Sequence, residues 1–315
     1  MHTYTYPHIP ALGALAATTG FFDGVHSGHR AVLRELLHVA KSSGLPSCVV
    51  TYHPHPRVVL GKDEGLFFLN TFEEKQQLLA SLGVEHLVVI PFTKELAELN
   101  AESFFVQYLL KTLNVQQLVV GYDHNMGKNA AAGFEAIKTL GKAHGVEITQ
   151  VQAYTQNAVE VSSTKARNAL DEGNILAANA MLGYEYSLSG TVINGNRVGS
   201  KIGFPTANIA PDCTQKMLPK NGAYAVRVTL GGGHYGGMLN VGTRPTVSNG
   251  GSRSVEVHIF DFSQNIYERE ITVSFVERLR EEKRMSSLEE LSRQLRKDEE
   301  RARELLMRTK TPSNP

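Results

Sequence analysis

The sequence predicts two domains of different fold class, an α/β domain with a parallel sheet and helices on both faces, then a small antiparallel β-barrel or sandwich with a terminal helix. The 315 residues exceed the usual size of one domain. In the first part, short apolar runs alternate with segments of helical period. From Tyr184 to Val276 this period disappears, and glycines with β-branched and aromatic residues dominate. The predicted domains are 1–183 and 184–307, followed by a disordered tail, 308–315.

Apolar runs in the first domain predict buried parallel strands, because helices covering both faces of a sheet leave such strands nearly continuously apolar. The runs are Ser47–Tyr52, His86–Pro91, Gln117–Tyr122 and Val146–Val151, and a further buried strand is expected before Gly20.

Helices are predicted between these strands from the spacing of apolar and capping residues. Leu33, Leu36, Leu37 and Ala40 follow the i, i+3, i+4, i+7 pattern. Thr71 and Glu74 have capping-box spacing at the start of a second helix, and Ala101–Leu113 is expected to be a third.

Alternating apolar residues predict antiparallel strands in the second domain. They are Ala223–Leu230, His234–Gly242, Val255–Phe262 and Ile271–Val276. A terminal helix follows, with a capping box predicted at Ser286 and Glu289 and an apolar stripe of Leu288, Leu291 and Leu295.

Composition excludes several classes of protein. A net charge of +1 gives no electrostatic case for binding nucleic acid or an anionic membrane. No apolar run approaches the roughly 18 residues that span a bilayer. Ile9–Phe22 is rather apolar. A signal peptide, however, requires basic residues before its apolar segment, and no Lys or Arg precedes Ile9. Two cysteines cannot build a disulfide framework. We expect a cytoplasmic protein, either a monomer or a weak oligomer.

The segment GFFDGVHSGH, Gly20–His29, predicts a phosphate-binding helix start. Helix N-termini offer unpaired N–H groups and a positive dipole end, and glycines let a polyphosphate approach them. His26 and His29 would then be donors that stabilise charge on a reacting phosphate. Two alternatives remain: a zinc site, although no partner ligands with suitable spacing stand nearby, or histidines that cap a surface helix.

Three further polar segments follow predicted strands: Tyr52–Leu60, Gly121–Gly133 and Ser162–Arg167. Ligands of parallel α/β sheets bind outside the carboxyl ends of the strands. Each segment alone is compatible with a plain loop or a helix cap. Together they favour a nucleotide-binding cleft at one edge of the sheet.

The second domain contains a Gly-rich basic stretch and a carboxylate on an apolar strand. Thr206 and Asn208 of GFPTAN lie on one face of a strand and carry the hard oxygen donors that Mg²⁺ prefers. Glu256 shares a strand face with His258 and has the chemistry of a general base for an alcohol. The alternatives are a structural β-turn at the glycines and a solvent-facing glutamate.

These motifs resemble one enzyme family. GFFDGVHSGH, YHPHP and SSTKAR occur in the order of the FMN adenylyltransferase module of bacterial bifunctional riboflavin kinase/FAD synthetases. GFPTAN, PKNGAYAV, NVGTRPT and VEVHIFDF resemble their riboflavin kinase module. The resemblance implies a Rossmann-like nucleotidyltransferase domain and a six-stranded antiparallel barrel with a terminal helix.

The resemblance also implies site residues in the first domain. His26 and His29 are expected to contact the ATP phosphates as the catalytic pair. Further expected ATP contacts are Gly20, Phe22, Asp23, Gly24, Gly28, Ser163, Thr164 and Arg167. The expected flavin contacts are His53, Pro54, His55, Pro56, Asp123 and Asn125.

In the second domain the resemblance implies that Glu256 is the catalytic base and that Thr206 and Asn208 bind Mg²⁺ and ATP phosphates. Arg280 is an expected flavin contact. The expected ATP-binding loop contains Gly195, Arg197, Gly199, Lys201 and Gly203.

The implied reactions use Mg²⁺ and ATP to convert riboflavin to FMN and FMN to FAD, with no nucleic acid or membrane partner. Two alternatives stay open. Family members usually carry an aromatic-x-aromatic-Gly element where this chain has His124, Asn125 and Met126, and they prefer Ile where it has Ala166. The first alternative is therefore a kinase with a weak or altered nucleotidyltransferase. The second is a flavin- or RNA-binding regulator.

Overall fold

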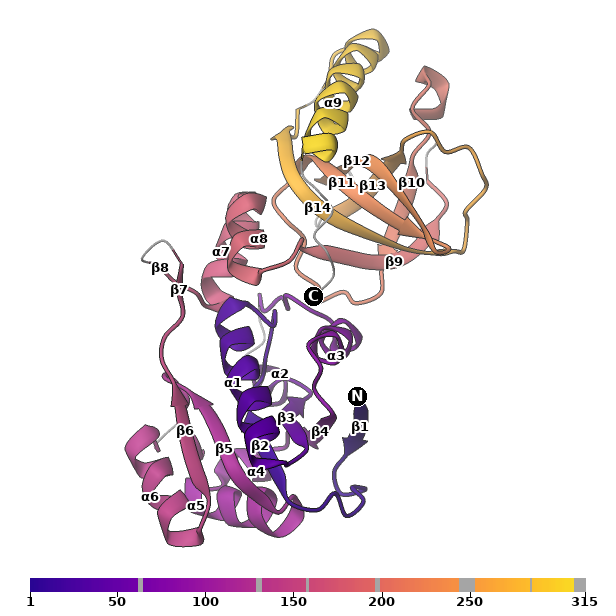
Figure 1. Cartoon of the computed structure of the whole chain (residues 1–315). Helices are drawn as coiled ribbons and strands as arrows, with labels where there is room; N and C mark the ends of the chain where they lie inside the picture. Colours follow the sequence, from indigo (N-terminus) through magenta and orange to yellow (C-terminus); the bar gives the residue numbers. More distant parts are fainter. Residues whose placement is uncertain are drawn as a thin grey trace. The chain divides into compact units, whose positions relative to one another are not determined.

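The computed structural model describes residues 1–61, 65–128, 132–156, 159–195, 199–243, 253–283 and 285–308. The chain forms two compact units, which divide between Ser162 and Ser163 (Figure 1). The predicted tail from residue 309 onward and Arg197 of the predicted ATP loop lie outside the described residues.

The first unit is built on a six-stranded parallel sheet with the strand order β1-β4-β3-β2-β5-β6. Its strands are β1 (His2–Thr5), β2 (Leu15–Thr19), β3 (Ser47–His53), β4 (His86–Pro91), β5 (Val115–Gly121) and β6 (Glu147–Val151), and a separate hairpin pairs β7 (Thr155–Gln156) with β8 (Val159–Glu160). Its helices are α1 (Ser27–Ser43), α2 (Pro56–Val59), α3 (Phe72–Ser81), α4 (Lys94–Glu98), α5 (Ala101–Phe104), η1 (Phe105–Thr112) and α6 (Phe134–His144).

Helices cover both faces of this sheet, as the sequence predicted. On one face, α1 and α3 pack on alternate residues of the central strands, such as Ala16 and Val49. On the other face, η1 and α6 pack on the strand residues in between, such as Ala17 and Val50. Because successive side chains of a strand point to opposite faces, both sets of alternate residues are buried.

Local capping interactions fix the starts of the helices nearest the site. Thr71 and Glu74 form both hydrogen bonds of the predicted capping box of α3. The edge strand β1 was not predicted, and it extends the sheet by pairing in parallel with β4. The single helix predicted at Ala101–Leu113 was wrong in detail, because α5 continues there as the π-helix η1.

The second unit is a closed barrel of six antiparallel strands, which resolves the choice between barrel and sandwich. Its strands are β9 (Ser187–Ile193), β10 (Ala207–Pro211), β11 (Gly222–Leu230), β12 (Gly233–Thr243), β13 (Arg253–Ile259) and β14 (Glu270–Glu281). The 3-10 helix η3 (Gly199–Ile202) precedes β10, and α9 (Leu288–Arg308) packs on the outside of the barrel through Ala302 and Leu305.

The N-cap of α9 lies one residue further along the chain than the predicted capping box placed it. Ser287, not Ser286, accepts the hydrogen bond from the N–H of Glu290. The Glu290 carboxylate in turn accepts from Ser286 N and Oγ at 2.8 and 2.7 Å. Several neighbouring Ser and Glu residues make either register possible, so the sequence alone leaves the exact start of the helix open by one residue.

The helices α7 (Ser163–Glu172) and α8 (Ile175–Leu182) belong to the compact unit that contains the barrel. Lys220 N donates to Leu170 O at 2.9 Å. The Asn179 amide donates to Phe275 O and accepts from Tyr186 N, both at 2.8 Å. The predicted domain boundary at residue 183 stays a prediction, whereas the contacts divide the chain 21 residues earlier.

Candidate active sites

The first candidate site lies where the strand order of the parallel sheet reverses, between β2 and β5. Neighbouring loops leave the sheet in opposite directions at such a point and open a crevice for ligands. The predicted motif Gly20–His29 spans the loop after β2 and the first residues of α1, and the loop after β5 begins at Tyr122. The topology therefore brings these two sequence motifs to the same edge of the sheet.

The histidine pair forms the start of α1. His26 is the N-cap residue, and its Nδ1 accepts the N–H of His29 at 3.3 Å. The two rings stack with centroids 3.6 Å apart and an interplanar angle of 16°. The capping interpretation of His26 is thus confirmed, although His26 is buried rather than on the surface. Because Nδ1 accepts a hydrogen bond, a neutral His26 carries its proton on Nε2.

Gly28 lies between the two histidines and permits their close stacking. A Cβ at this position would be 3.2 Å from the His26 ring and 3.6 Å from the carbonyl oxygen of Val161. The segment that leads into α7 therefore lies against the start of α1. Ser163 and Thr164 are the first residues of α7, and Arg167 lies in its second turn. Their predicted role at the triphosphate stays a prediction.

His29 is held neutral by its surroundings. Burial lowers its pKa well below the usual value, and the charges of His26 and Lys75 lower it further. Its Nδ1 is shielded from solvent and has no hydrogen-bond partner among the described residues. A neutral imidazole has one ring nitrogen that donates and one that accepts, so an unused nitrogen can form a hydrogen bond with a ligand. Lys75 on α3 was not predicted as a site residue, because its sequence context is that of an ordinary helix.

Asp23 joins the phosphate loop to the segment that precedes α3. Its carboxylate accepts the N–H of Leu69 at 3.1 Å and that of Asn70 at 3.3 Å. These two bonds hold the chain before α3 against the loop after β2. Gly24 adopts φ +83°, which few residues with a side chain tolerate. Asp23 was predicted as an ATP contact, and its hydrogen bonds give it a positioning role as well.

An aromatic cluster lies beside the loop after β3. The partly exposed ring of Phe21 is 5.1 Å from Tyr52 and 5.2 Å from His55. Tyr52 is also held by a 2.7 Å hydrogen bond to Thr19. His55 Nδ1 accepts the N–H of Arg57 and caps the short helix α2, which contains Pro56. Phe21 offers a flat apolar surface that the sequence did not predict, because an aromatic residue after a strand is common.

The loop after β5 contains a half-buried histidine. Burial lowers the pKa of His124 to about 4, and its Nε2 has no partner among the described residues. Asn125 donates to the backbone oxygen of Asp123 at 2.8 Å, which orders the turn. Met126 is buried in the core of the sheet and pairs with Ala132. The apolar side chain of Met126 thus anchors the loop.

The second candidate site lies on the barrel. In the sheet register, Glu256 of β13 stands opposite Asn208 of β10 and Asn240 of β12. Thr206 Oγ1 is 3.5 Å from the Glu256 carboxylate. Glu256 and His258 lie on the more exposed face of β13, while the alternate residues are buried, as predicted. The strand register therefore gathers the predicted Thr, Asn and Glu side chains in one place.

The glycines of the predicted ATP loop make room for this cluster. A Cβ at Gly195 would overlap the Asn208 amide, and one at Gly199 would overlap the carbonyl oxygen of Phe204. Gly203 adopts φ +86° directly after η3, on which Lys201 lies. Close packing thus requires glycine at Gly195 and Gly199.

Arg280 is paired with a carboxylate of the terminal helix. Its guanidinium nitrogens lie 2.8 to 3.1 Å from the Asp298 carboxylate, which also accepts from Gln294 at 2.8 Å. This bidentate pair fastens α9 to β14. The predicted flavin contact of Arg280 stays a prediction.

The oxygen donors of the barrel cluster suit Mg²⁺. Mg²⁺ in nucleotide enzymes is bound by one or two protein oxygens together with substrate phosphates. Thr206, Asn208 and Glu256 provide a hydroxyl, an amide and a carboxylate within one cluster. No group of three or more His, Cys, Asp or Glu side chains that could hold a metal occurs among the described residues. The donor set thus fits a metal brought with ATP.

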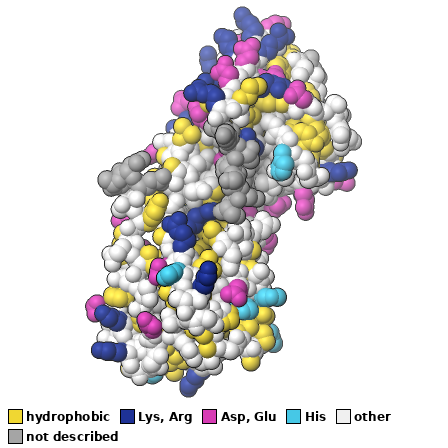
Figure 2. Space-filling model, in the orientation of Figure 1, with side chains coloured by type: hydrophobic (Ala, Val, Ile, Leu, Met, Phe, Trp, Pro, Cys, Tyr) yellow, Lys and Arg dark blue, Asp and Glu magenta, His cyan; other side chains and the backbone are white. Residues whose placement is uncertain are grey.

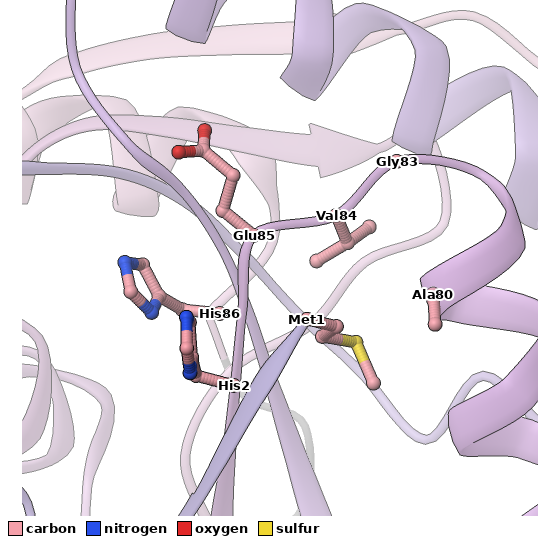
Figure 3. A pocket seen from close by; sticks show the side chains of 7 residues that line it. All are labelled: Met1, His2, Ala80, Gly83, Val84, Glu85 and His86. Carbon is pink, nitrogen blue, oxygen red and sulfur yellow. The ribbon is translucent and has the colours of Figure 1, made fainter.

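A pocket of about 380 Å³ lies at the amino ends of β1 and β4, the opposite end of the strands from the candidate site (Figure 3). The rings of His2 and His86 are 5.9 Å apart at its rim. The Glu85 carboxylate accepts from Ser47 N at 3.0 Å. The phosphate motifs follow the carboxyl ends of the strands, so this pocket is separate from the candidate active site.

Comparisons with known proteins match the two units in the same order. The family described as FAD synthetase matches residues 9–165, and the family described as riboflavin kinase matches residues 182–306. The chain belongs to the bifunctional riboflavin kinase/FMN adenylyltransferase family. Relatives of that name from Escherichia coli K12 and Bacillus subtilis 168 are each 37% identical, over 93% and 90% of both chains, respectively. Most of the α7–α8 hairpin falls between the two matched segments.

A solved structure has the same fold over nearly its whole length. It is described as a macrolide-efflux protein from Streptococcus pneumoniae, is 30% identical, and covers 96% of this chain and 98% of its own with a TM-score of 0.88. Within the described part of the present chain, no helix is long and apolar enough to cross a membrane.

Proposed function

We propose that this chain catalyses two consecutive reactions of flavin cofactor synthesis. The barrel unit phosphorylates riboflavin with ATP, giving FMN and ADP, and the parallel-sheet unit transfers AMP from ATP to FMN, giving FAD and pyrophosphate. The observation that carries this proposal is the ordered match of both family modules to two units, each with a matching cluster of polar groups. Efflux of macrolides is not proposed, because the family matches cover both halves of the chain and name flavin enzymes.

In the kinase reaction we assign Glu256 as the general base. A primary alcohol is a poor nucleophile, so the 5′-hydroxyl of riboflavin must lose its proton as it attacks the γ-phosphorus. The Glu256 carboxylate accepts this proton, while ADP departs. The contact between Thr206 and Glu256 and the register of Asn208 support this assignment, because the groups proposed to bind phosphate lie beside the proposed base.

In the adenylyl transfer we assign His26 and His29 as phosphate donors. An oxygen of the FMN phosphate attacks the α-phosphorus of ATP, the bond to the bridging oxygen breaks, and pyrophosphate leaves. The nucleophile is already an anion, so no general base is required. Catalysis then depends on positioning and on donors aimed at the developing charge. The stacked pair at the start of α1 supports this role.

We further propose that Mg²⁺ enters with ATP at Thr206 and Asn208, where it would neutralise phosphate charge. The exposed ring of Phe21 and the His53–Pro56 segment are proposed to contact the flavin, since a flat aromatic ring stacks well on an aromatic side chain. A cytoplasmic monomer or weak oligomer is proposed in keeping with two free cysteines and a near-neutral charge.

The first experiment is chromatography of purified protein incubated with riboflavin, Mg²⁺ and ATP and sampled over time. We expect FMN to appear first and FAD to follow. A second reaction that starts from FMN isolates the adenylyl transfer. Accumulation of FMN without FAD in both reactions would favour the altered nucleotidyltransferase. The absence of both products would overturn the proposal.

A further inference from the structure

Lys75 is an exception on the buried side of α3. Phe72 lies three residues before it and Leu79 four residues after it, so the three share one side of the helix. Leu79 is buried, and Phe72 packs on the apolar cluster that contains Phe22 and Val25. Lysines are rarely placed on such a face, because burial of an ammonium group is unfavourable unless a partner compensates.

Within the described part of the chain, the ammonium of Lys75 has no such direct partner. It makes neither a hydrogen bond nor an ion pair with any described residue. Burial lowers its pKa, and the more distant charge of Asp23 only partly opposes this effect. A half-buried ammonium group on an apolar helix face, with no partner among the described residues, is unfavourable for the fold, and this points to a ligand that compensates for it.

The position of Lys75 identifies the kind of ligand. Asp23 fastens the chain before α3 to the loop after β2 through Leu69 and Asn70. The ring of Phe72 is 5.0 Å from His53 at the end of β3. The positive charge of Lys75 lowers the pKa of both His29 and His53. Lys75 is therefore close to the histidine at the start of α1, whose Nδ1 also lacks a partner.

We propose that Lys75 binds a phosphate oxygen of the adenylyl-transfer reactants beside His29. The inference rests on the proposed function of the parallel-sheet unit and adds a residue to it. An ammonium group is a point charge that suits phosphate, and the start of α1 provides further donors for the same anion. The phosphate belongs either to ATP and its pyrophosphate product or to FMN, and the experiment separates these two sources.

The test compares Lys75→Met, Lys75→Arg and the wild type, with Lys41→Met as the matched control. Lys41 is exposed near the end of α1, so its substitution removes the same charge from the same unit. For Lys75→Met we expect kcat/KM for FAD formation to fall about 100-fold, as when one transition-state donor is lost. Lys75→Arg should restore part of the rate, and Lys41→Met should have no effect.

Three readouts separate phosphate binding from a structural role. FMN formation by the barrel should be unchanged in every variant. The melting temperature of Lys75→Met should stay equal or rise, because a half-buried charge without a partner among the described residues is removed. Calorimetric titration with Mg·pyrophosphate reports on the ligand directly. Weaker pyrophosphate binding identifies the ATP phosphates, whereas a raised KM for FMN with unchanged pyrophosphate binding identifies the flavin phosphate.

The inference is overturned if Lys75→Met forms FAD at the wild-type rate. It is also overturned if the variant loses activity together with melting temperature and Lys75→Arg restores neither. If the wild type makes no FAD, the proposed function fails, and the pyrophosphate titration still decides whether Lys75 binds phosphate.

Discussion

The two units assemble their proposed phosphate sites from different parts of their folds. In the parallel-sheet unit, His26 and His29 come from a loop and a helix start, and Asp23 fastens a second segment to them. In the barrel, Thr206, Asn208 and Glu256 lie on or beside paired strands whose register places them together. The difference matches the proposed chemistry, since an FMN phosphate requires only donors, whereas an alcohol requires a base.

The net charge differs between the units but is small in each: residues 1–162 carry 11 Lys and Arg against 14 Asp and Glu, and the rest of the chain carries 21 against 17. The chain carries 32 Lys and Arg against 31 Asp and Glu. Over α9, Figure 2 shows basic and acidic side chains interspersed. The contrast between the two sites therefore depends on a few side chains in each, and single substitutions can test it.

The largest effect is expected for Glu256→Gln. The amide keeps the shape of the side chain but cannot accept the proton, so FMN formation should fall about 1000-fold. FAD formation from added FMN should be unchanged. Steady-state assays of both reactions measure this, with Glu270→Gln as a control on an exposed glutamate of β14. Equal loss of both activities would contradict separate sites.

Acid is expected to destabilise the parallel-sheet unit through His124. The folded pKa of His124 is about 4, against 6.5 in the unfolded chain, so the unfolded state binds the proton first. His124 therefore contributes about 3 kcal/mol to the free energy of unfolding above pH 6.5, and this contribution is lost as the pH falls toward 4. Hydrogen exchange measured for each unit at pH 7 and pH 5 should show this loss, and His124→Phe should reduce it. Equal acid sensitivity of the variant would contradict the assignment.

His29→Ala should lower FAD formation about 100-fold, because one donor at the reacting phosphate is removed. FMN made from riboflavin should then accumulate, since the barrel is unchanged. Chromatography of the products measures both effects. His38→Ala, an exposed position of α1, is the matched control. Normal FAD formation by His29→Ala would refute the phosphate role.

A smaller effect is expected for Gly195→Ala. The added methyl group would overlap the Asn208 amide and displace it, which should lower FMN formation about tenfold. FAD formation from FMN serves as the internal control. An unchanged rate of FMN formation would mean that the loop relaxes around the methyl group and that the position of Asn208 is not critical.

The sequence predicted well those features that depend on local patterns. The strand His86–Pro91 and the capping box of Thr71 and Glu74 were found as predicted, because period and capping act within a few residues. The strand β1 was missed because an edge strand of four residues, with little burial, has a weak pattern. The cap of α9 was placed one residue early because Ser286 and Ser287 are both suitable.

The candidate sites show the same division. His26, His29, Thr206 and Glu256 were identified because chemistry-bearing residues stand out beside glycines or on apolar strands. Lys75 and Phe21 were not, because a lysine in a helix and an aromatic residue after a strand are common. Only their neighbours in space distinguish them.

By itself, the sequence determined the two fold classes, their order and the residue types of both sites, since these depend on short patterns and motifs along the chain. The tertiary structure decided which groups meet. It closed the six strands into a barrel, grouped α7 and α8 with that barrel, and brought α3 to the loop after β2. Such contacts join residues far apart in the chain, and they are selected by the burial of whole surfaces rather than by any local pattern.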